Sequence, residues 1–450
     1  MYGTVAFAFQ VSLFATKTMA YILRVVSAAP SRANIAAKRE FSALVSTLEE
    51  FPSIPLTSPA PSAASTASVT KLPSGLTVVS ENASSSSTIS MTFPNAGSSS
   101  ESASDVGAAL VNKCLAFKSG SGLSSALIAR SLEEEGATPF VTTGRMGATI
   151  GYTAPPDKAS VLVPLLATNC SFEKWDVSDA IKLAGVEVED AMSNAQTVLS
   201  ESVFAAAYGP QSPMGRPFYS TGASAASIKS FRESAYVLSG AVLAATGIPD
   251  HGAFVQSVEE GLSEAAIGSS TEAPTPLFVG GESRIYSPSA GFAHVAFAFP
   301  APSSGPLLDV IKKCLNLSSL DNISSFGSSG LLGVYSHSSP IEASTAVDAM
   351  CSVVTTNPST EVVETAKLLA KAEAIFALDS GSKNLAGCMT TSVLANGTFD
   401  ASAIAASYDS ISAADVAKVF SSMAKTIPAV AAVGDIVNVP YQGTIAAKFS

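Results

Sequence analysis

The sequence predicts an α+β fold of two homologous domains, each a largely antiparallel sheet packed with helices. Its 450 residues are too many for one typical domain. Similar segments recur in the same order in both halves. In each half, short alternating strands come in hairpin-like pairs before Ala-rich helices, and strands return after the helices. This arrangement favours antiparallel sheets over a regular strand–helix–strand winding.

The internal repeat consists of four pairs of segments. These are residues 90–94 (SMTFP) with 296–300 (AFAFP), 111–115 (VNKCL) with 311–315 (IKKCL), 159–160 (AS) with 343–344 (AS), and 241–245 (AVLAA) with 429–433 (AVAAV). One such match is weak evidence. Unrelated segments would not stay collinear over four matches, so the series indicates a duplication.

The N-terminus has the composition of a mitochondrial transit peptide. Residues 1–41 contain five basic residues and a single acid, Glu40, so they carry about +4 while the remainder carries about −15. Residues 39–42 (REFS) resemble a matrix-processing site with cleavage after Phe41. The apolar start, residues 1–16, leaves a secretory signal as the alternative, although it lacks a basic n-region. Residues 42–69 are predicted to be a flexible Pro/Ser/Ala-rich arm.

The first domain is predicted over residues 70–266. It holds strands at 76–80 and 90–93, a helix at 107–120, a second helix at 123–135, and a closing strand at 241–245. The spacing between repeats shortens after the second of these helices, so the second copy is expected to lack it. Residues 267–276 have linker composition. The second domain is predicted over 277–450, with a long helix at 361–377.

Composition excludes several classes of function. A net charge of −11 opposes nucleic-acid binding, which needs a basic face. Only 14% of residues are charged and 47% are hydrophobic, so part of the surface is expected to be buried against partner subunits. The five cysteines form no CxxC pair and are interpreted as reduced thiols. The histidines, His251, His294 and His337, are far apart in sequence, and each is interpreted as an isolated core or surface residue.

No cofactor is expected. The sequence contains no CxxCH, GxGxxG, P-loop or GxSxG pattern.

Several segments resemble the pitrilysin-type metallopeptidases, which include the mitochondrial processing peptidase. The resemblance includes residues 75–79 (GLTVV), the helix at 107–120 (GAALVNKCLAFKSG), residues 205–209 (AAAYG) and residues 212–217 (SPMGRP). It extends over essentially the whole chain after residue 70, including the duplication.

The resemblance implies an inactive peptidase centre. In active members the first helix carries the inverted zinc motif His-x-x-Glu-His, and here Leu110, Lys113 and Cys114 stand at those three places. The third family ligand is a Glu one long helix downstream. Glu187, Glu189 and Asp190 lie in that neighbourhood and are interpreted as a solvated helix face. The resemblance therefore implies no catalytic residue, no metal site and no enzyme activity of this chain.

Two kinds of family member lack this metal site: the core subunits of ubiquinol:cytochrome c reductase (respiratory complex III) and the alpha subunit of the processing peptidase. Residues 324–335 (SSFGSSGLLGVY) are most similar to core protein 2. This implies a structural subunit, peripheral on the matrix side of the mitochondrial inner membrane and without a transmembrane helix. Its partners would be a core 1-like chain and the cytochrome b and cytochrome c-type subunits.

The alternative is the presequence-binding alpha subunit, which would use acidic surface such as Glu133, Glu134 and Glu135. Its known glycine-rich loop is expected within residues 315–333, where Gly327, Gly330 and Gly333 are scattered and are interpreted as turn residues.

Overall fold

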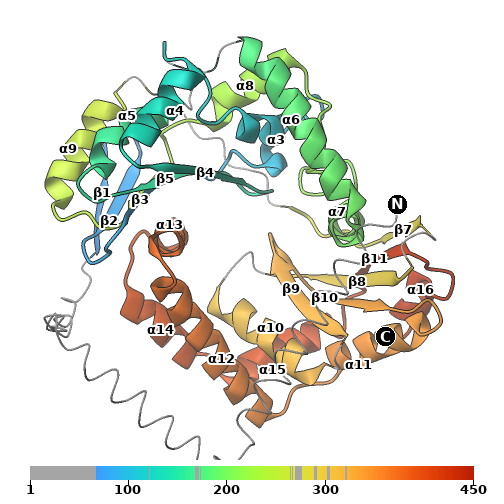
Figure 1. The fold of residues 1–450 in the computed structure, drawn as a ribbon. Coiled ribbons are helices and arrows are strands. Elements are labelled where there is room, and N and C mark those ends of the chain that lie inside the picture. The colour runs from blue at the N-terminus through green and yellow to red at the C-terminus, as the bar shows by residue number, and fades with distance from the viewer. Residues whose placement is uncertain are drawn as a thin grey trace, which may run out of the picture. The chain divides into compact units, whose positions relative to one another are not determined.

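The computed structural model describes residues 67–120, 122–167, 172, 174–263, 265, 267–268, 276–287, 291–301, 305–319 and 322–449. The transit peptide predicted at 1–41, most of the predicted arm, most of the predicted linker, and Cys170 lie outside the described residues. Residues 63–450 form one compact unit that contains two mixed sheets with their helices (Figure 1). The predicted α+β fold is confirmed.

The first sheet has six strands in the order β1-β2-β6-β3-β5-β4. Their bounds are β1 (Ala67–Lys71), β2 (Thr77–Glu81), β3 (Ser87–Phe93), β4 (Thr138–Thr143), β5 (Ala148–Ala154) and β6 (Val242–Ala245). All neighbours are antiparallel except β2 and β6, which are parallel. Residues 67–69, predicted to belong to the arm, are part of β1.

The second sheet repeats this order with five strands, β7-β11-β8-β10-β9. They are β7 (Glu282–Tyr286), β8 (Ala293–Pro300), β9 (Ile323–Ser328), β10 (Leu331–Ser338) and β11 (Ala429–Gly434). Here too one pair, β7 and β11, is parallel and the rest are antiparallel. The second sheet therefore matches the first strand for strand, apart from β1.

A glycine–phenylalanine contact recurs at the same place in both sheets. Gly151 of β5 faces Phe140 of the edge strand β4, and Gly333 of β10 faces Phe326 of the edge strand β9. A methyl group added at either glycine would lie 2.7 Å or 2.5 Å from the ring carbon Cζ of its phenylalanine. The aromatic ring thus covers the space that the missing side chain leaves.

The first half contains the two predicted helices and further helices after them. They are α3 (Ala108–Cys114), α4 (Ser125–Glu134), α5 (Pro164–Ala167), α6 (Lys174–Ser193), α7 (Ala195–Tyr208), α8 (Ala225–Ala235) and α9 (His251–Gly261), with short 3₁₀ turns η1 (Ser98–Ser100) and η2 (Ala159–Leu162). The helix predicted at 107–120 is shorter than expected. It ends at Cys114, and Phe117 in the following turns adopts a left-handed φ of 54°.

The second half has α10 (Pro306–Ser318), α11 (Ala343–Thr355), α12 (Thr360–Asp379), α13 (Ser382–Asn396), α14 (Ala401–Asp409), α15 (Ala413–Met423) and α16 (Gln442–Ala446). In its described part, no helix comes between α10 and β9, the place where α4 stands in the first half. None of the helices in the described part of the chain is both long and apolar enough to cross a membrane.

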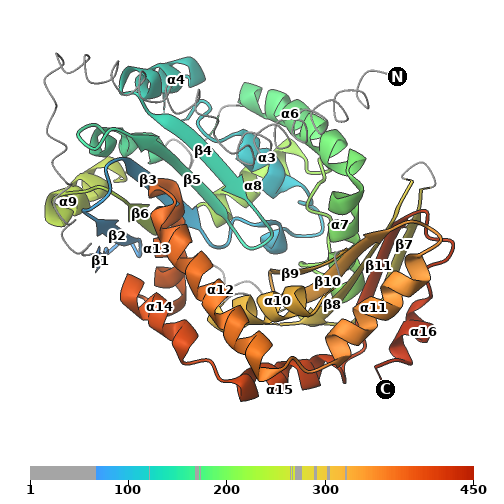
Figure 2. The same cartoon turned by 60° about the horizontal axis from the view of Figure 1, so that its bottom comes forward.

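Each half contributes one helix to the other half's sheet. The apolar side of α7 packs on β8 and β11, where Leu199 and Val203 join Ala296 and Ala431 in one buried cluster. In return α13 packs on β2, β3 and β6 through Ala386, Met389 and Val393. Figures 1 and 2 both place α7 beside the second sheet and α13 beside the first.

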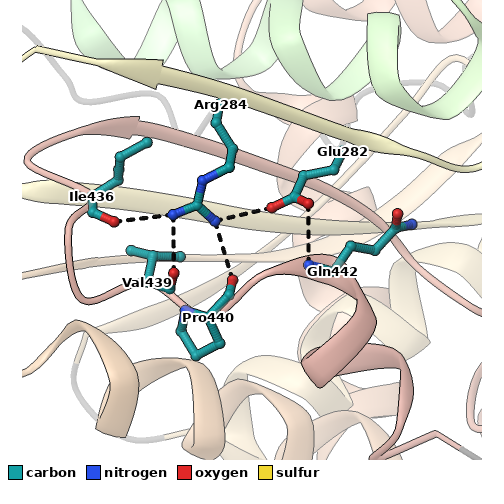
Figure 3. Close-up of polar contacts among 6 residues, drawn as sticks. All are labelled: Glu282, Arg284, Ile436, Val439, Pro440 and Gln442. Atoms are coloured by element: carbon teal, nitrogen blue, oxygen red, sulfur yellow. Dashed lines mark hydrogen bonds and ion pairs between the residues drawn. The ribbon is translucent and has the colours of Figure 1, made fainter.

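The C-terminal turn is fixed to the edge strand β7 by Arg284 (Figure 3). Its guanidinium pairs with Glu282 at 2.9 Å and donates to the carbonyl oxygens of Ile436, Val439 and Pro440 at 3.0, 2.9 and 3.2 Å. In the first half the corresponding turn is held with the opposite polarity, because the Glu81 carboxylate accepts the backbone N–H of Gly247.

Candidate functional site at the contact of α3 and α6

The helix α3 is positioned by a buried carboxylate at its start. Glu101 is 3% exposed and accepts hydrogen bonds from the backbone N–H groups of Gly107 and Ala109, at 3.1 and 2.7 Å. These are donors that a helix start otherwise leaves unpaired. Burial raises the pKa of Glu101 to about 7, because desolvation outweighs the opposing effect of the two backbone hydrogen bonds.

Three side chains of α3 stand where the resemblance places a zinc motif. Leu110 is fully buried in the first hydrophobic core. The Lys113 ammonium forms an ion pair with Glu187 of α6, with 2.5 Å between Nζ and Oε1. Burial, and next the Glu187 carboxylate, raise the pKa of the Cys114 thiol. The positive charge between the two helices therefore comes from the Lys113 ammonium. A lysine has no carboxylate, so Lys113 cannot act as the carboxylate base of a peptidase.

The second half contains the same ion pair at the corresponding place. Lys313 of α10 pairs with Glu373 of α12, and Cys314 follows Lys313 as Cys114 follows Lys113. Burial raises the pKa of Cys314 to about 11. The contact between the first helix and the long helix is thus built from the same three residue types in both halves.

The two acidic residues that follow Glu187 in α6 differ from it in solvent exposure. Glu189 and Asp190 are exposed, as the interpretation of a solvated face requires. That interpretation is wrong for Glu187, which is about one-third exposed and ion-paired. Within the described ranges, no three His, Cys, Asp or Glu side chains are grouped so that they could hold a metal ion.

A second, more deeply buried ion pair lies beside this contact. Arg145 pairs with Glu201 of α7 at 2.7 Å, and the two side chains are 7% and 14% exposed. Arg145 also donates to the carbonyl oxygens of Met214 and Arg216 and lies 4.2 Å from the ring centroid of Phe204. This network ties the β4–β5 turn to α7.

Arg145 and Glu201 line a pocket of about 680 Å³. The pocket also includes Thr142 and Thr143 of β4, Tyr219, and Ser329 at the tip of the β9–β10 hairpin. A larger pocket of about 800 Å³ lies between the first sheet and α12, α13 and α14, and it too includes Thr142. The strand β4 pairs only with β5 within the described residues, so its outer backbone edge is open beside both pockets. An open edge is where an extended peptide can add a strand.

Two further sequence interpretations are refined. Glu134 and Glu135 are neutralised in part by ion pairs with Arg130 and Lys158.

Only Gly330 lies in a turn, with a φ of 85°. Gly327 and Gly333 lie inside the strands β9 and β10, contrary to their interpretation as turn residues.

The interpretation of three isolated histidines is wrong for two of them. His294 of β8 and His337 of β10 are cross-strand partners whose ring centroids are 6.4 Å apart. His294 also hydrogen-bonds the Tyr335 hydroxyl at 2.8 Å. His251 instead contacts the hydroxyls of Thr70 and Ser80. The strand register, which no short motif encodes, brings the first two together.

Comparison with known proteins finds a family match within the first half. Residues 77–222 match the model of the insulinase family, peptidase family M16. The match covers about one-third of the chain. Its range includes α3, α6, Lys113, Glu187 and the buried Arg145–Glu201 pair. The M16 match agrees with the peptidase-like resemblance deduced from the first-half motifs.

The chain is similar to subunits of the mitochondrial processing peptidase. It is 28% identical over 242 residues to the Solanum tuberosum mitochondrial-processing peptidase subunit alpha. The aligned region covers 52% of this chain and 47% of that protein. It is also 28% identical over 242 residues to the Arabidopsis thaliana probable subunit alpha-2, covering 52% and 48%. The chain therefore spans about half the length of the curated relatives that it matches.

Proposed function

We propose that this chain is a non-catalytic M16-type subunit that binds presequence-like peptides for a catalytic partner, as an alpha-type subunit of a mitochondrial processing peptidase. The Lys113–Glu187 ion pair carries this proposal. A lysine where a metalloenzyme needs a carboxylate leaves no general base, and a metal dication would be repelled. The names of the relatives support the alpha-type assignment.

Peptide binding has a physical basis at the open edge of β4. Its unpaired backbone groups can hydrogen-bond an extended peptide, and the two pockets, which share Thr142 and Thr149, can receive side chains on one face of that peptide. A peptide held there would be recognised mainly through its backbone. This suits a subunit that must accept many different sequences.

The partner in this proposal is a second M16-type chain that keeps its zinc site, the counterpart of the core 1-like partner. The proposed mature chain starts after the transit peptide at 1–41 and contains the domains 70–266 and 277–450. The basic N-terminal composition and the names of the relatives support a mitochondrial location.

Reconstitution with a catalytic M16 partner tests the proposal. Cleavage of a presequence-bearing precursor is measured with the partner alone, with this chain alone, and with both together. We expect rapid cleavage only with both. A Lys113→Met variant serves as the matched control and should support cleavage as well as the wild type does. Equal cleavage by the partner alone would contradict a peptide-binding role.

A core 2-like subunit of complex III is the second candidate, and the β9–β10 hairpin favours it. These strands are joined through Ser329 and Gly330 alone, so the hairpin has no long glycine-rich loop. Native purification from mitochondrial membranes in mild detergent separates the candidates. Co-purifying b- and c-type haem would support the complex III role, whereas a haem-free heterodimer that cleaves presequences would support the processing role.

A further inference from the structure

The helix α12 exposes four large apolar side chains, and α6 likewise exposes Trp175, Leu183, Val186 and Met192. Leu368, Leu369, Ile375 and Phe376 are 69%, 44%, 38% and 68% exposed. Their spacing of one, seven and eight residues places them on one side of the helix. The opposite side is buried in the second core through Val363, Ala366 and Ala370. We call the four exposed residues the α12 outer face.

The duplication supplies an internal reference for this surface. The ion pairs align Glu187 of α6 with Glu373 of α12, an offset that also aligns Leu183 with Leu369. At the places of Leu368, Ile375 and Phe376, α6 carries Lys182, Glu189 and Asp190, all exposed. The fold therefore accepts charged residues at these positions, and packing within this chain does not require the apolar ones. An apolar side chain where a charged one is tolerated indicates a docking surface.

Carboxylates border the α12 outer face. Glu361, Glu364, Glu373 and Asp379 are exposed on the same helix. Both of its lysines are ion-paired: Lys371, which is 30% exposed, with Asp409 of α14, and Lys367, which is 16% exposed, with Glu364. Glu373 pairs with Lys313 of α10, whereas none of the ion pairs found among the described residues involves Glu361 or Asp379. The border is therefore acidic, without an exposed basic residue on the helix.

We propose that the α12 outer face docks an amphipathic helix whose apolar side is bordered by Lys and Arg. This proposal rests on the proposed function, since it assigns the helical part of a presequence-like peptide to a surface away from β4. The acidic border from Glu361 to Asp379 spans about 27 Å, the length of an 18-residue helix at about 1.5 Å per residue. An anionic membrane surface does not fit, because the carboxylates would be repelled by it.

Fluorescence anisotropy on the full chain tests this docking. The probe is a labelled, helix-forming 18-residue peptide of Leu, Ala and Arg, and the same peptide with Glu in place of Arg is the charge control. We expect Leu368→Ser with Phe376→Ser to weaken binding of the basic peptide by about ten-fold, equivalent to about 1.4 kcal/mol. The Glu-containing peptide should bind neither protein.

The matched control variant lies on α6. Lys182→Ser with Asp190→Ser changes the equivalent positions, and it should leave the affinity unchanged. Because all four side chains are exposed, circular dichroism and the melting temperature should match those of the wild type in both variants. Removing charge by Glu361→Gln with Asp379→Asn should weaken binding at low salt and flatten its salt dependence.

Each remaining outcome overturns the docking in a distinguishable way. Unchanged affinity in the α12 variant would show that the peptide binds elsewhere and would leave the proposed function standing. No binding by the wild type would contradict both the docking and the peptide-binding function. Loss of a co-purifying partner chain with unchanged peptide affinity would make the α12 outer face a subunit interface instead.

Discussion

The contact between α3 and α6 in the first half has a counterpart between α10 and α12 in the second. Both contacts consist of a lysine, the cysteine that follows it, and a glutamate on the long helix. The family resemblance places the zinc motif in the first half only. A first-half contact that matches the second half is therefore explained by helix packing alone. The contact in the second half therefore serves as a non-catalytic reference for the contact in the first half.

The halves also differ in the side-chain contacts of α7 and α13. Position 201 of α7 carries a glutamate that is paired with Arg145, whereas Cys388 stands at the equivalent place of α13 and lines the larger pocket. The first half thus keeps a buried charge network beside β4, and the second half replaces it with a half-buried thiol. This asymmetry is where the two halves should respond most differently to substitution.

The largest expected effect is the loss of one partner of the buried pair. Arg145→Ala leaves the Glu201 carboxylate buried without its counter-charge, and we expect it to lower the free energy of unfolding by about 3 kcal/mol. Replacing both partners by apolar residues, Arg145→Met with Glu201→Leu, should cost less. Cys388→Ala at the equivalent place of α13 should change stability little. Urea denaturation measures all three, and equal losses for the single and double changes would contradict the assignment.

The next effect is a pH dependence confined to the first half. Because burial raises the pKa of Glu101 to about 7 from 4.5, the folded chain holds this proton more tightly than the unfolded chain does. Stability is then highest below about pH 4.5 for this group, falls as the pH rises to about 7, and is constant above. The total contribution is about 3 kcal/mol.

Glu101→Gln tests this pH dependence, because it should remove the fall in stability between about pH 4.5 and 7. The helix α10 begins at Gly305 and Pro306 without a carboxylate cap, so its amide exchange serves as an internal reference for α3. A slope that Glu101→Gln leaves unchanged would assign the pH dependence to another group.

The two Lys–Glu pairs should give the smallest effects, and these should be alike. Both pairs are partly exposed, so Lys113→Met and Lys313→Met should each cost about 1 kcal/mol or less. Reversing the pair by Lys113→Glu with Glu187→Lys should restore most of the loss in the first half. Melting temperatures of the four proteins measure this. A much larger loss from Lys113→Met would mean that the first-half contact has a role that the second half lacks.

Much of the fold could be predicted from the sequence because the duplication leaves local traces. The collinear repeats identified equivalent strands such as β6 and β11, and the change of spacing identified α4 as an element of the first copy. Strand alternation indicated antiparallel pairing, which the sheets confirm. These features depend on residues that are close together in the sequence, so they can be predicted from one sequence alone.

The site was less predictable because it depends on residues distant in sequence. Lys113 and Glu187 are 74 residues apart and meet only when α3 packs on α6. The exchange of α7 and α13 between sheets also left no local pattern, since neither helix sequence indicates which sheet it covers. The pairing of His294 with His337 requires the register of β8 and β10.

The zinc content of the purified full chain tests the central claim most directly. Metal analysis after dialysis against zinc, with peptide hydrolysis measured on the same sample, should find substoichiometric zinc and no cleavage. The triple change Leu110→His, Lys113→Glu and Cys114→His should increase zinc retention, because it returns two imidazoles and a carboxylate beside Glu187. One zinc per wild-type chain together with peptide hydrolysis would contradict a non-catalytic subunit.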